Sequence, residues 1–286
     1  MTTIRPPRAP RRSTPFRSPS FLGRLFSILL GLFLYAPIFV MIVYSFNDSK
    51  SRTVWAGFTL SWYKELFTNS LILSALSTTL SVAFIATAIS TVVGTIAAIG
   101  IHQHKGFPKS ALLTLNNLPV ISPDIITGVS FRMLFLVVLS ILGSWGLNFS
   151  LGYGTLLLSH LAFCIPYVIL SVMPKLSQMG KHVYEAALDL GATPAMALRK
   201  VIFPEILPGI ISGALIAFTM SIDDFMISFF TSGDSVQTLP IYVYSMTRRR
   251  MSPEINALST LMFIAVLLLL VGINVFQAKD AKKNRV

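Results

Sequence analysis

The chain has 286 residues, of which 53% are hydrophobic and 12% charged, and its mean hydropathy is +0.72. A water-soluble domain of this size cannot bury so much apolar surface, so the composition excludes a soluble globular protein and indicates a membrane protein. The formal net charge of +12 would suit a nucleic-acid-binding protein. The basic residues, however, gather at the ends of apolar segments, where they set membrane topology and meet anionic lipid headgroups. We therefore expect one all-α membrane domain and no nucleic-acid partner.

In chain order, residues 1–24 are rich in Arg, Pro and Ser and are expected to form a disordered basic cytoplasmic tail. A six-helix transmembrane domain is expected over residues 25–277, because six segments can each cross ~30 Å of hydrocarbon as a helix. These segments are 25–46, 71–101, 111–142, 155–176, 206–231 and 256–277. The second and third exceed one simple crossing, and Pro119 and Pro123 predict that the third is broken. Residues 278–286 are expected to form a cytoplasmic C-terminal tail.

The distribution of lysine and arginine predicts which ends of the spans face the cytoplasm, where positive charge accumulates. With the N-terminus inside, sixteen of the 23 Lys and Arg residues fall on cytoplasmic segments, six fall outside, and Arg132 lies within the third span. Both termini are therefore expected in the cytoplasm. The densest basic run on the outside, Arg248–Arg250, has two open interpretations: a docking point for a soluble protein on that side, or a solvated or headgroup-binding group of charges.

A polar stretch between the fourth and fifth spans, residues 178–204, has the sequence signals of two short helices. Gly191 follows a helix-compatible run and suits the position after a helix end that needs a positive φ. Thr193 and Pro194 suit the cap and first turn of a second helix, which Pro204 is expected to end. The predicted topology places this loop on the cytoplasmic side, where a soluble partner has access.

The fifth span carries two adjacent acids, Asp223 and Asp224, within its apolar run. Each costs ~2.5–3.5 kcal/mol to insert, so the pair needs a partner or a water-filled path. If the span is one continuous helix, Ser221, Asp224 and Ser228 share a stripe and Asp223 lies on a neighbouring one. One stripe is predicted to line a solute path and the other to pair with another helix or with Arg132. A purely structural role in helix packing is the alternative.

Asp124 in the third span adds an acid at a comparable depth. At 1.5 Å per helical residue, Asp224 lies ~24 Å beyond Pro208 and Asp124 lies ~20 Å beyond Ala111, so both acids are expected in the outer half of the membrane. Negative charge near an external gate favours a cationic solute that arrives from outside. The candidate substrate path comprises Asp124, Asp223, Asp224, Ser221 and Ser228.

The polar loop also carries a motif found in a known family. The sequence Glu185-Ala186-Ala187, three residues, Gly191, nine residues and Val201-x-Phe203-Pro204 resembles the EAA loop of permease subunits of bacterial ATP-binding-cassette (ABC) importers. Val201 and Phe203 replace the family's Ile and Leu. The resemblance implies a MetI-like type I importer bundle in the bacterial cell inner membrane, with a loop that seats in a groove of a cytoplasmic ATPase. The residues expected to take part in this coupling are Glu185, Ala186, Ala187, Gly191, Pro194 and Pro204.

Further stretches resemble the permeases of polyamine importers of the Pot type, and the resemblance covers residues 30–277. They are Tyr44-Ser-Phe-Asn47, Trp55-Ala-Gly-Phe58, Trp62-Tyr63, Pro123-Asp-Ile-Ile-Thr-Gly128, Ser221-Ile-Asp-Asp-Phe225 and Pro253-Glu-Ile-Asn-Ala-Leu258. The similarity implies a second, related permease, two copies of an ABC ATPase and a periplasmic polyamine-binding protein that delivers putrescine or spermidine. The run Arg248–Arg250 departs from the single Arg expected at this place.

The chain contains no GxxxxGK[ST] phosphate-binding sequence, so ATP and its Mg²⁺ are expected on the partner ATPase, with no cofactor and no catalysis in this chain. Neither CxxC nor HExxH is present to suggest a metal site. Two alternatives stay open: an ABC permease for an anion, sugar or metal chelate, and an ion-coupled carrier that uses the intramembrane aspartates as ion sites. An enzyme has the least support, since the four histidines offer no nucleophile–base–orienter arrangement.

Overall fold

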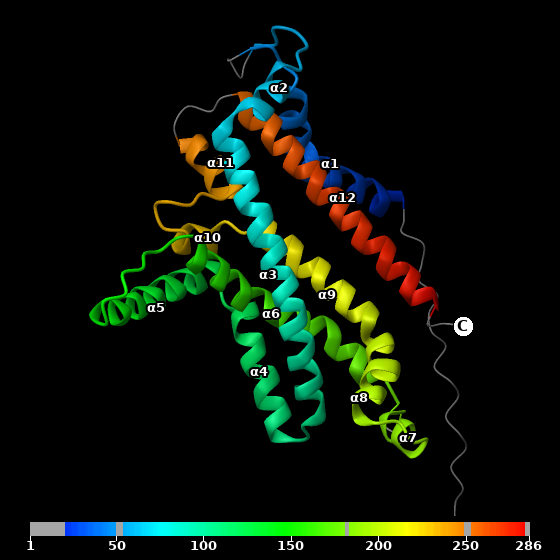
Figure 1. Ribbon diagram of the computed structural model, residues 1–286. Coiled ribbons are helices and arrows are strands. Elements are labelled where there is room, and N and C mark those ends of the chain that lie inside the picture. The colour runs from blue at the N-terminus through cyan, green and yellow to red at the C-terminus, as the bar shows by residue number, and fades with distance from the viewer. Residues whose placement is uncertain (1–20, 50–53, 181–182, 249–252, 284–286) are drawn as a thin grey trace, which may run out of the picture.

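The computed structural model describes residues 21–49, 54–180, 183–248 and 253–283. The regular elements in these ranges are helices, and six segments are long and apolar enough to cross a membrane. The expected all-α, six-span architecture is therefore confirmed (Figure 1). The spanning segments are α1 (Phe21–Tyr44), α3 (Ser70–Gln103), α5 (Asp124–Ser144), α6 (Tyr153–Gln178), the helical run Pro194–Asp223, and α12 (Pro253–Lys283).

Shorter helices connect these spans or begin and extend them. They are α2 (Ser61–Thr68), α4 (Phe107–Ile121), α7 (Val183–Asp189), α8 (Pro194–Ala197), the π-helix η1 (Leu198–Ile202), α10 (Met226–Thr231) and α11 (Leu239–Arg248). The long helix α9 (Phe203–Asp223) follows η1 directly. α1 begins within the tail expected over residues 1–24, and α12 runs through most of the tail expected over 278–286. Residues 1–20, Arg249 and Arg250 lie outside the described ranges.

The third span is broken, as its prolines predict. α4 ends at Ile121 and α5 begins at Asp124, with Ser122 in an extended conformation at ψ 138°. Proline at position 123 disfavours a helical conformation at the preceding residue, which is why the break falls there. Pro119, in contrast, lies inside α4. In Figure 1, α5 leaves the bundle at a steep angle to α4.

The fifth span differs from the prediction at both ends. Pro204 does not end a helix: the chain continues through η1 into α9, with Pro204 in the first turn of α9. The wide π turn, in which the Phe203 N–H donates to the Leu198 carbonyl, lets helical backbone pass a residue that has no N–H to donate. The helix expected over 206–231 is not continuous either, because α9 ends at Asp223 and Asp224 is extended at ψ 122°.

Helix α6 lies at the centre of the bundle and packs against α3 and α9. Its contact with α9 is close because α9 presents Gly209 and Gly213, one turn apart, to the backbone of α6. A Cβ at Gly213 would lie 3.1 Å from the Val168 Cα, and one at Gly209 would lie 3.0 Å from the Ser171 carbonyl oxygen. Small residues at this spacing are a common device for joining membrane helices. The main apolar core gathers around this contact and includes Val168, Val172 and Ile206.

A second apolar cluster lies at the other end of α3, where α2, α11 and the start of α12 meet. Asn47, only 1% exposed, organises the loop beside it: its amide donates to the Val54 carbonyl at 2.8 Å and its side-chain oxygen accepts from the Ala56 N–H at 2.9 Å. The Trp62 indole donates to the Asn47 carbonyl at 2.9 Å. Asn47 therefore ties residues 54 and 56 and the start of α2 to the end of α1.

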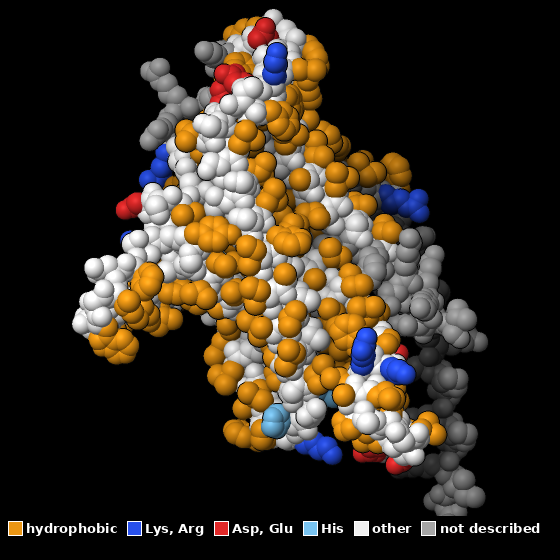
Figure 2. Space-filling view, viewed as in Figure 1, with side chains coloured by type: hydrophobic (Ala, Val, Ile, Leu, Met, Phe, Trp, Pro, Cys, Tyr) orange, Lys and Arg blue, Asp and Glu red, His pale blue; other side chains and the backbone are white. Residues whose placement is uncertain are grey.

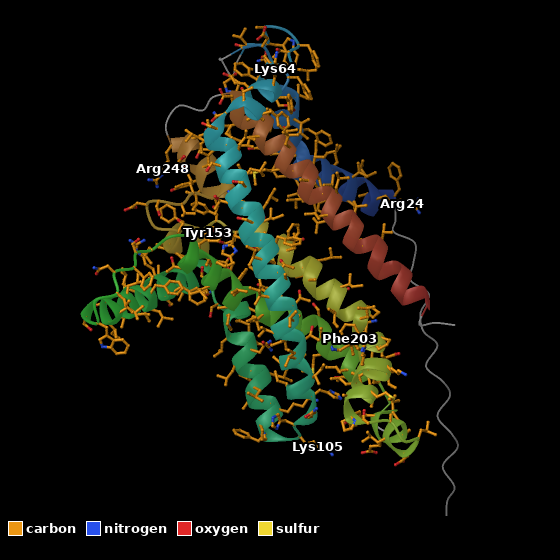
Figure 3. All side chains as sticks on the ribbon, viewed as in Figure 1. Arg24, Lys64, Lys105, Tyr153, Phe203 and Arg248 are labelled. Carbon is orange, nitrogen blue, oxygen red and sulfur yellow. The ribbon has the colours of Figure 1, made fainter. Side chains whose placement is uncertain are left out.

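The two ends of the bundle differ in what they display. Lys64 and Arg248 lie toward one end, whereas Lys105 lies at the opposite end with the α7–α8 loop (Figures 1 and 3). Between the ends the surface is largely apolar (Figure 2), and α1 has no buried residue at all. Gly128 is the one buried residue of α5. Such faces suit contact with lipid or with another membrane subunit.

Candidate functional site

The loop between α6 and α9 has the backbone conformation that its sequence predicts. α7 ends in a Schellman motif: the Gly191 N–H donates to the Leu188 carbonyl at 2.9 Å, and the Ala192 N–H donates to the Ala187 carbonyl at 3.1 Å. Gly191 has φ +84°, which an L side chain adopts at a cost. The Thr193 hydroxyl then caps α8 by accepting the Met196 N–H at 3.3 Å, with Pro194 in the first turn.

The surface of this loop is exposed and partly apolar. Leu190 is 89% exposed, and Met196, Leu198 and Phe203 are each more than 40% exposed. Glu185, Ala186, Gly191, Pro194 and Pro204 are exposed as well. Apolar side chains projecting from a solvent-accessible turn are typical of a protein docking surface. The sequence does not predict a docking role for Leu190, which lies between the Glu185 motif and Gly191, because a single leucine in a helix-forming run does not indicate which way its side chain faces.

Three buried side chains attach the loop to the bundle: Ala187 and Ile202 are 9% and 8% exposed, and Ala197 is fully buried. From Pro194 the helical backbone continues without interruption to Asp223. The loop and the fifth-span acids are thus the two ends of one element.

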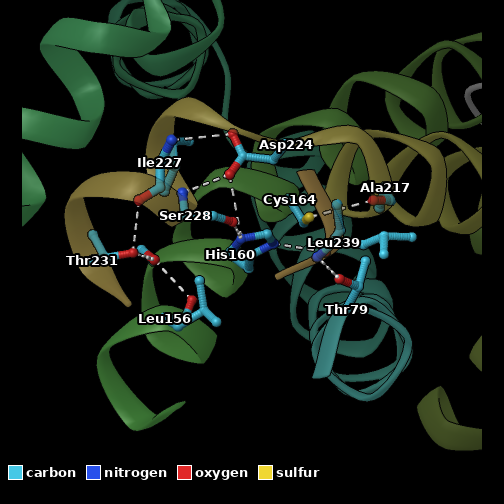
Figure 4. Close-up of polar contacts among 12 residues, drawn as sticks. Thr79, Leu156, His160, Cys164, Ala217, Asp224, Ile227, Ser228, Thr231 and Leu239 are labelled. Carbon is cyan, nitrogen blue, oxygen red and sulfur yellow. Dashed lines mark hydrogen bonds and ion pairs between the residues drawn. The ribbon is translucent and has the colours of Figure 1, made fainter. Parts of the chain in front are cut away.

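At that far end, a buried polar cluster joins α6 to α9 and α10 (Figure 4). His160 of α6, 2% exposed, contacts the Ser221 hydroxyl through Nδ1 at 2.7 Å and the Ser228 hydroxyl through Nε2 at 3.0 Å. Its Nε2 also lies 3.5 Å from Asp224 Oδ2, an ion pair when the imidazole is protonated. A second contact follows one turn earlier on α6, where the Thr155 hydroxyl donates to the Thr231 carbonyl at 2.7 Å.

Asp224 also holds the start of α10. Its Oδ1 accepts the Ile227 N–H at 3.2 Å and its Oδ2 accepts the Ser228 N–H at 2.7 Å. These are backbone donors that the helix break leaves without partners, and a carboxylate at a helix start satisfies them and complements the helix dipole. The Asp224 side chain is 6% exposed as a result.

The candidate path residues therefore separate into two groups. Ser221, Asp224 and Ser228 come together around His160 and are covered in this conformation. Asp223 and Asp124 are exposed in the chain. Among the bonds that the described residues form, Arg132 has none with either of these acids. Its Nη1 donates a hydrogen bond to the Phe230 carbonyl oxygen at 3.2 Å. The partner of Asp224 is His160, which the sequence signals only as an imidazole inside an apolar span.

The two helix breaks lie next to each other. Gly128, one turn after Asp124 in α5, packs against α10, and a Cβ there would lie 3.1 Å from the Met226 carbonyl oxygen. Aromatic rings border the same region. The centroid of the Tyr244 ring of α11 lies 4.7 Å from the centroid of the Phe225 ring. The breaks of the third and fifth spans thus place two exposed carboxylates near aromatic side chains.

This architecture, a broken-helix membrane bundle with an exposed polar loop, is that of a transport permease. Residues 90–283 match the family described as the binding-protein-dependent transport system inner membrane component, and the chain belongs to this family. It is accordingly a multi-pass inner-membrane protein.

Two relatives show which proteins of this kind the chain resembles in sequence. The chain is 37% identical to the spermidine/putrescine transport system permease protein PotC of Haemophilus influenzae over 88% of this chain and 94% of the relative. It is 40% identical to the putrescine transport system permease protein PotI of Escherichia coli over 85% of this chain and 86% of that protein.

Solved structures share the fold at lower identity. A bacterial ABC transporter that imports the acidic polysaccharide alginate contains a chain with a TM-score of 0.72 and 16% identity, covering 91% of this chain and 94% of that one. The inward-facing MetNI methionine ABC transporter gives a TM-score of 0.58 at 19% identity, over 73% of this chain and 98% of that one. These likenesses concern the fold alone, since the identities are low.

Proposed function

We propose that this chain is a permease subunit of an ATP-driven importer that moves a polyamine, putrescine or spermidine, from the periplasm to the cytoplasm. The observation that carries the proposal is the 37–40% identity to polyamine permeases over more than four-fifths of the chain. The proposed partners are a second, related permease, two copies of an ATPase that binds ATP and Mg²⁺, and a periplasmic polyamine-binding protein. The chain itself supplies the path and the coupling loop and carries out no chemical step.

The shape of the α7–α8 loop supports its role as the coupling element. Its Schellman turn and capped second helix hold Leu190 and Glu185 at the tip of a compact projection. The positive-inside distribution of Lys and Arg favours the cytoplasmic side for this tip. In the proposed mechanism, ATP-driven closure of the ATPase pair moves the loop as a rigid body, and the helical run Pro194–Asp223 transmits the movement.

The charges at the helix breaks support a cationic solute. Asp124 and Asp223 are exposed carboxylates at adjacent breaks, and Phe225 and Tyr244 add aromatic faces that attract ammonium groups. Asp224, Ser221 and Ser228 take part by fixing the break, with His160 as their anchor. Discontinuous helices are the usual place for solute sites in membrane transporters. A path must also release its solute, so binding at these two carboxylates is expected to be weak.

Uptake by the reconstituted transporter tests the proposal. Proteoliposomes with the complete complex and ATP inside should accumulate labelled putrescine or spermidine only when the loaded binding protein is present outside. A non-hydrolysable ATP analogue should stop uptake even when ion gradients are kept, which separates this function from that of an ion-coupled carrier. Uptake of an anionic sugar in preference to either polyamine would overturn the assignment of the cargo.

A further inference from the structure

A cavity of about 760 Å³ lies beside the coupling loop, away from the helix breaks. Its lining residues lie at the end of α3, the start of α4 and the end of α6; Figure 1 shows these helix ends together at one end of the bundle. One wall comes from α3, α4 and α6; the other comes from the loop, through Tyr184, Pro194 and Leu198. The cavity therefore separates the part of the chain that is proposed to move from the part that anchors it.

The lining combines an apolar interior with a basic edge. Ile99, Leu176 and Ile202 form apolar walls, whereas His102 and Lys109 form the basic edge. His102 Nδ1 is inaccessible to solvent, so Lys109 is the nitrogen donor on which an anion in the cavity depends. The described residues that line the cavity include no acid. An anion with an attached apolar portion matches this arrangement.

We infer that this cavity binds one anionic phospholipid, with its phosphate at Lys109, beside His102, and the upper part of an acyl chain against Ile99, Leu176 and Ile202. Basic pockets between membrane helices on the cytoplasmic side are suited to acidic lipid headgroups. The volume falls within the range of small-molecule sites, which suffices for a headgroup and the start of a chain. A free phosphate ion would use the basic edge alone and leave the apolar walls unfilled.

A lipid in this position would bridge the coupling loop and the α3–α4 turn. It would favour one loop position over others, so that ATPase coupling would depend on the anionic lipid content of the membrane. This consequence rests on the proposed function and on the predicted sidedness, whereas lipid binding itself requires only the cavity. The two can therefore be tested apart.

Native mass spectrometry of the complete transporter in mild detergent tests the binding. Phosphatidylglycerol should be retained in preference to phosphatidylcholine, and Lys109→Gln should weaken that retention about fivefold, the effect expected for one basic residue. Lys105→Gln is the matched control, because Lys105 lies in the same turn, is exposed and does not line the cavity. Equal losses in the two variants, or no preference for the anionic lipid, would overturn the inference.

A second variant separates a lipid from a free phosphate. Ile99→Trp fills the cavity from α3 and leaves Lys109 and His102 in place, so it should reduce phosphatidylglycerol retention at least fivefold. Inorganic phosphate, added alone, should not displace the lipid from the wild-type complex; displacement would show that the site selects phosphate and would contradict the proposal. A complex that binds the lipid yet imports no polyamine would instead count against the proposed function only.

Discussion

The coupling loop and the His160 cluster lie at opposite ends of the helical run Pro194–Asp223, and they are built in opposite ways. The loop holds its shape with bonds between residues at most five apart, such as Ala192 N–H to the Ala187 carbonyl. The cluster depends on bonds between residues 61 and 68 positions apart, from His160 to Ser221 and Ser228. The loop is exposed and the cluster is buried.

This difference separates two requirements of a transporter. A surface that docks a partner must be preformed and accessible, and local hydrogen bonds set the backbone shape of such a surface while leaving it exposed. A broken helix inside a membrane must have its free backbone groups satisfied within the protein, because lipid offers no hydrogen bonds. Asp224 meets that second requirement, and His160 holds Asp224 in place. Changes at the cluster should therefore affect stability, and changes at the loop should affect coupling.

The largest effect is expected for Asp224→Ala. The substitution leaves the Ile227 and Ser228 N–H groups without acceptors and removes the acidic partner of His160, so the free energy of unfolding should fall by about 2–4 kcal/mol. The loss of stability is measured by thermal unfolding of the purified transporter, with size-exclusion chromatography reporting how much folded protein remains. The control is Asp223→Ala, whose side chain is exposed and should change stability by less than about 0.5 kcal/mol. Equal losses in both variants would break the contrast between the buried and the exposed acid.

A substitution at Gly191 comes next and should leave stability nearly intact. Valine disfavours φ +84° at a cost of about 1–2 kcal/mol, which favours loop conformations that do not dock, so binding-protein-stimulated ATPase activity should fall about 5- to 30-fold. No atom lies within 4 Å of a Cβ built at Gly191, so the effect should come from the backbone alone. Gly191→Asn, which tolerates this φ, should keep activity within about threefold of wild type. An equally inactive asparagine variant would show that the glycine is needed for contact with the partner rather than for its φ.

The substitution Leu190→Ser tests whether the exposed surface of the loop binds the ATPase. If the exposed leucine is buried against the ATPase, its loss should weaken ATPase association about tenfold, the equivalent of ~1.4 kcal/mol. Association can be measured by titrating the ATPase onto the permease pair in nanodiscs. Leu147→Ser is the control, since Leu147 is also exposed and lies in the loop between α5 and α6. The docking assignment fails if both serine variants bind the ATPase like wild type.

The smallest effects are expected for Asp124→Asn and Asp223→Asn. Each removes one exposed carboxylate from the proposed polyamine path, so the KM for polyamine uptake should rise about two- to fivefold while stability stays unchanged. Asp234→Asn, an exposed acid in the turn after α10, should leave KM as it is. Wild-type uptake kinetics in the double variant Asp124→Asn/Asp223→Asn would remove the cationic-path argument.

The sequence by itself determined the features that depend on composition and near neighbours. Six apolar stretches predicted six spans, Pro123 predicted the break before α5, and Gly191 and Thr193 predicted the turn and cap of the loop. Each of these features follows from the backbone preference of a single residue or from the length of an apolar run. Neither kind of signal requires knowledge of the fold.

Only the tertiary structure decided how the fifth span is built. The sequence predicted that Pro204 would end a helix and that residues 206–231 would form one helix, and both expectations were wrong. The break at Asp224 is held by α6, which packs against α9 at Gly209 and Gly213 and presents His160 to the break. A buried acid acquires its partner from whichever helix lies beside it, and that neighbour is fixed by the packing of the whole bundle rather than by nearby residues.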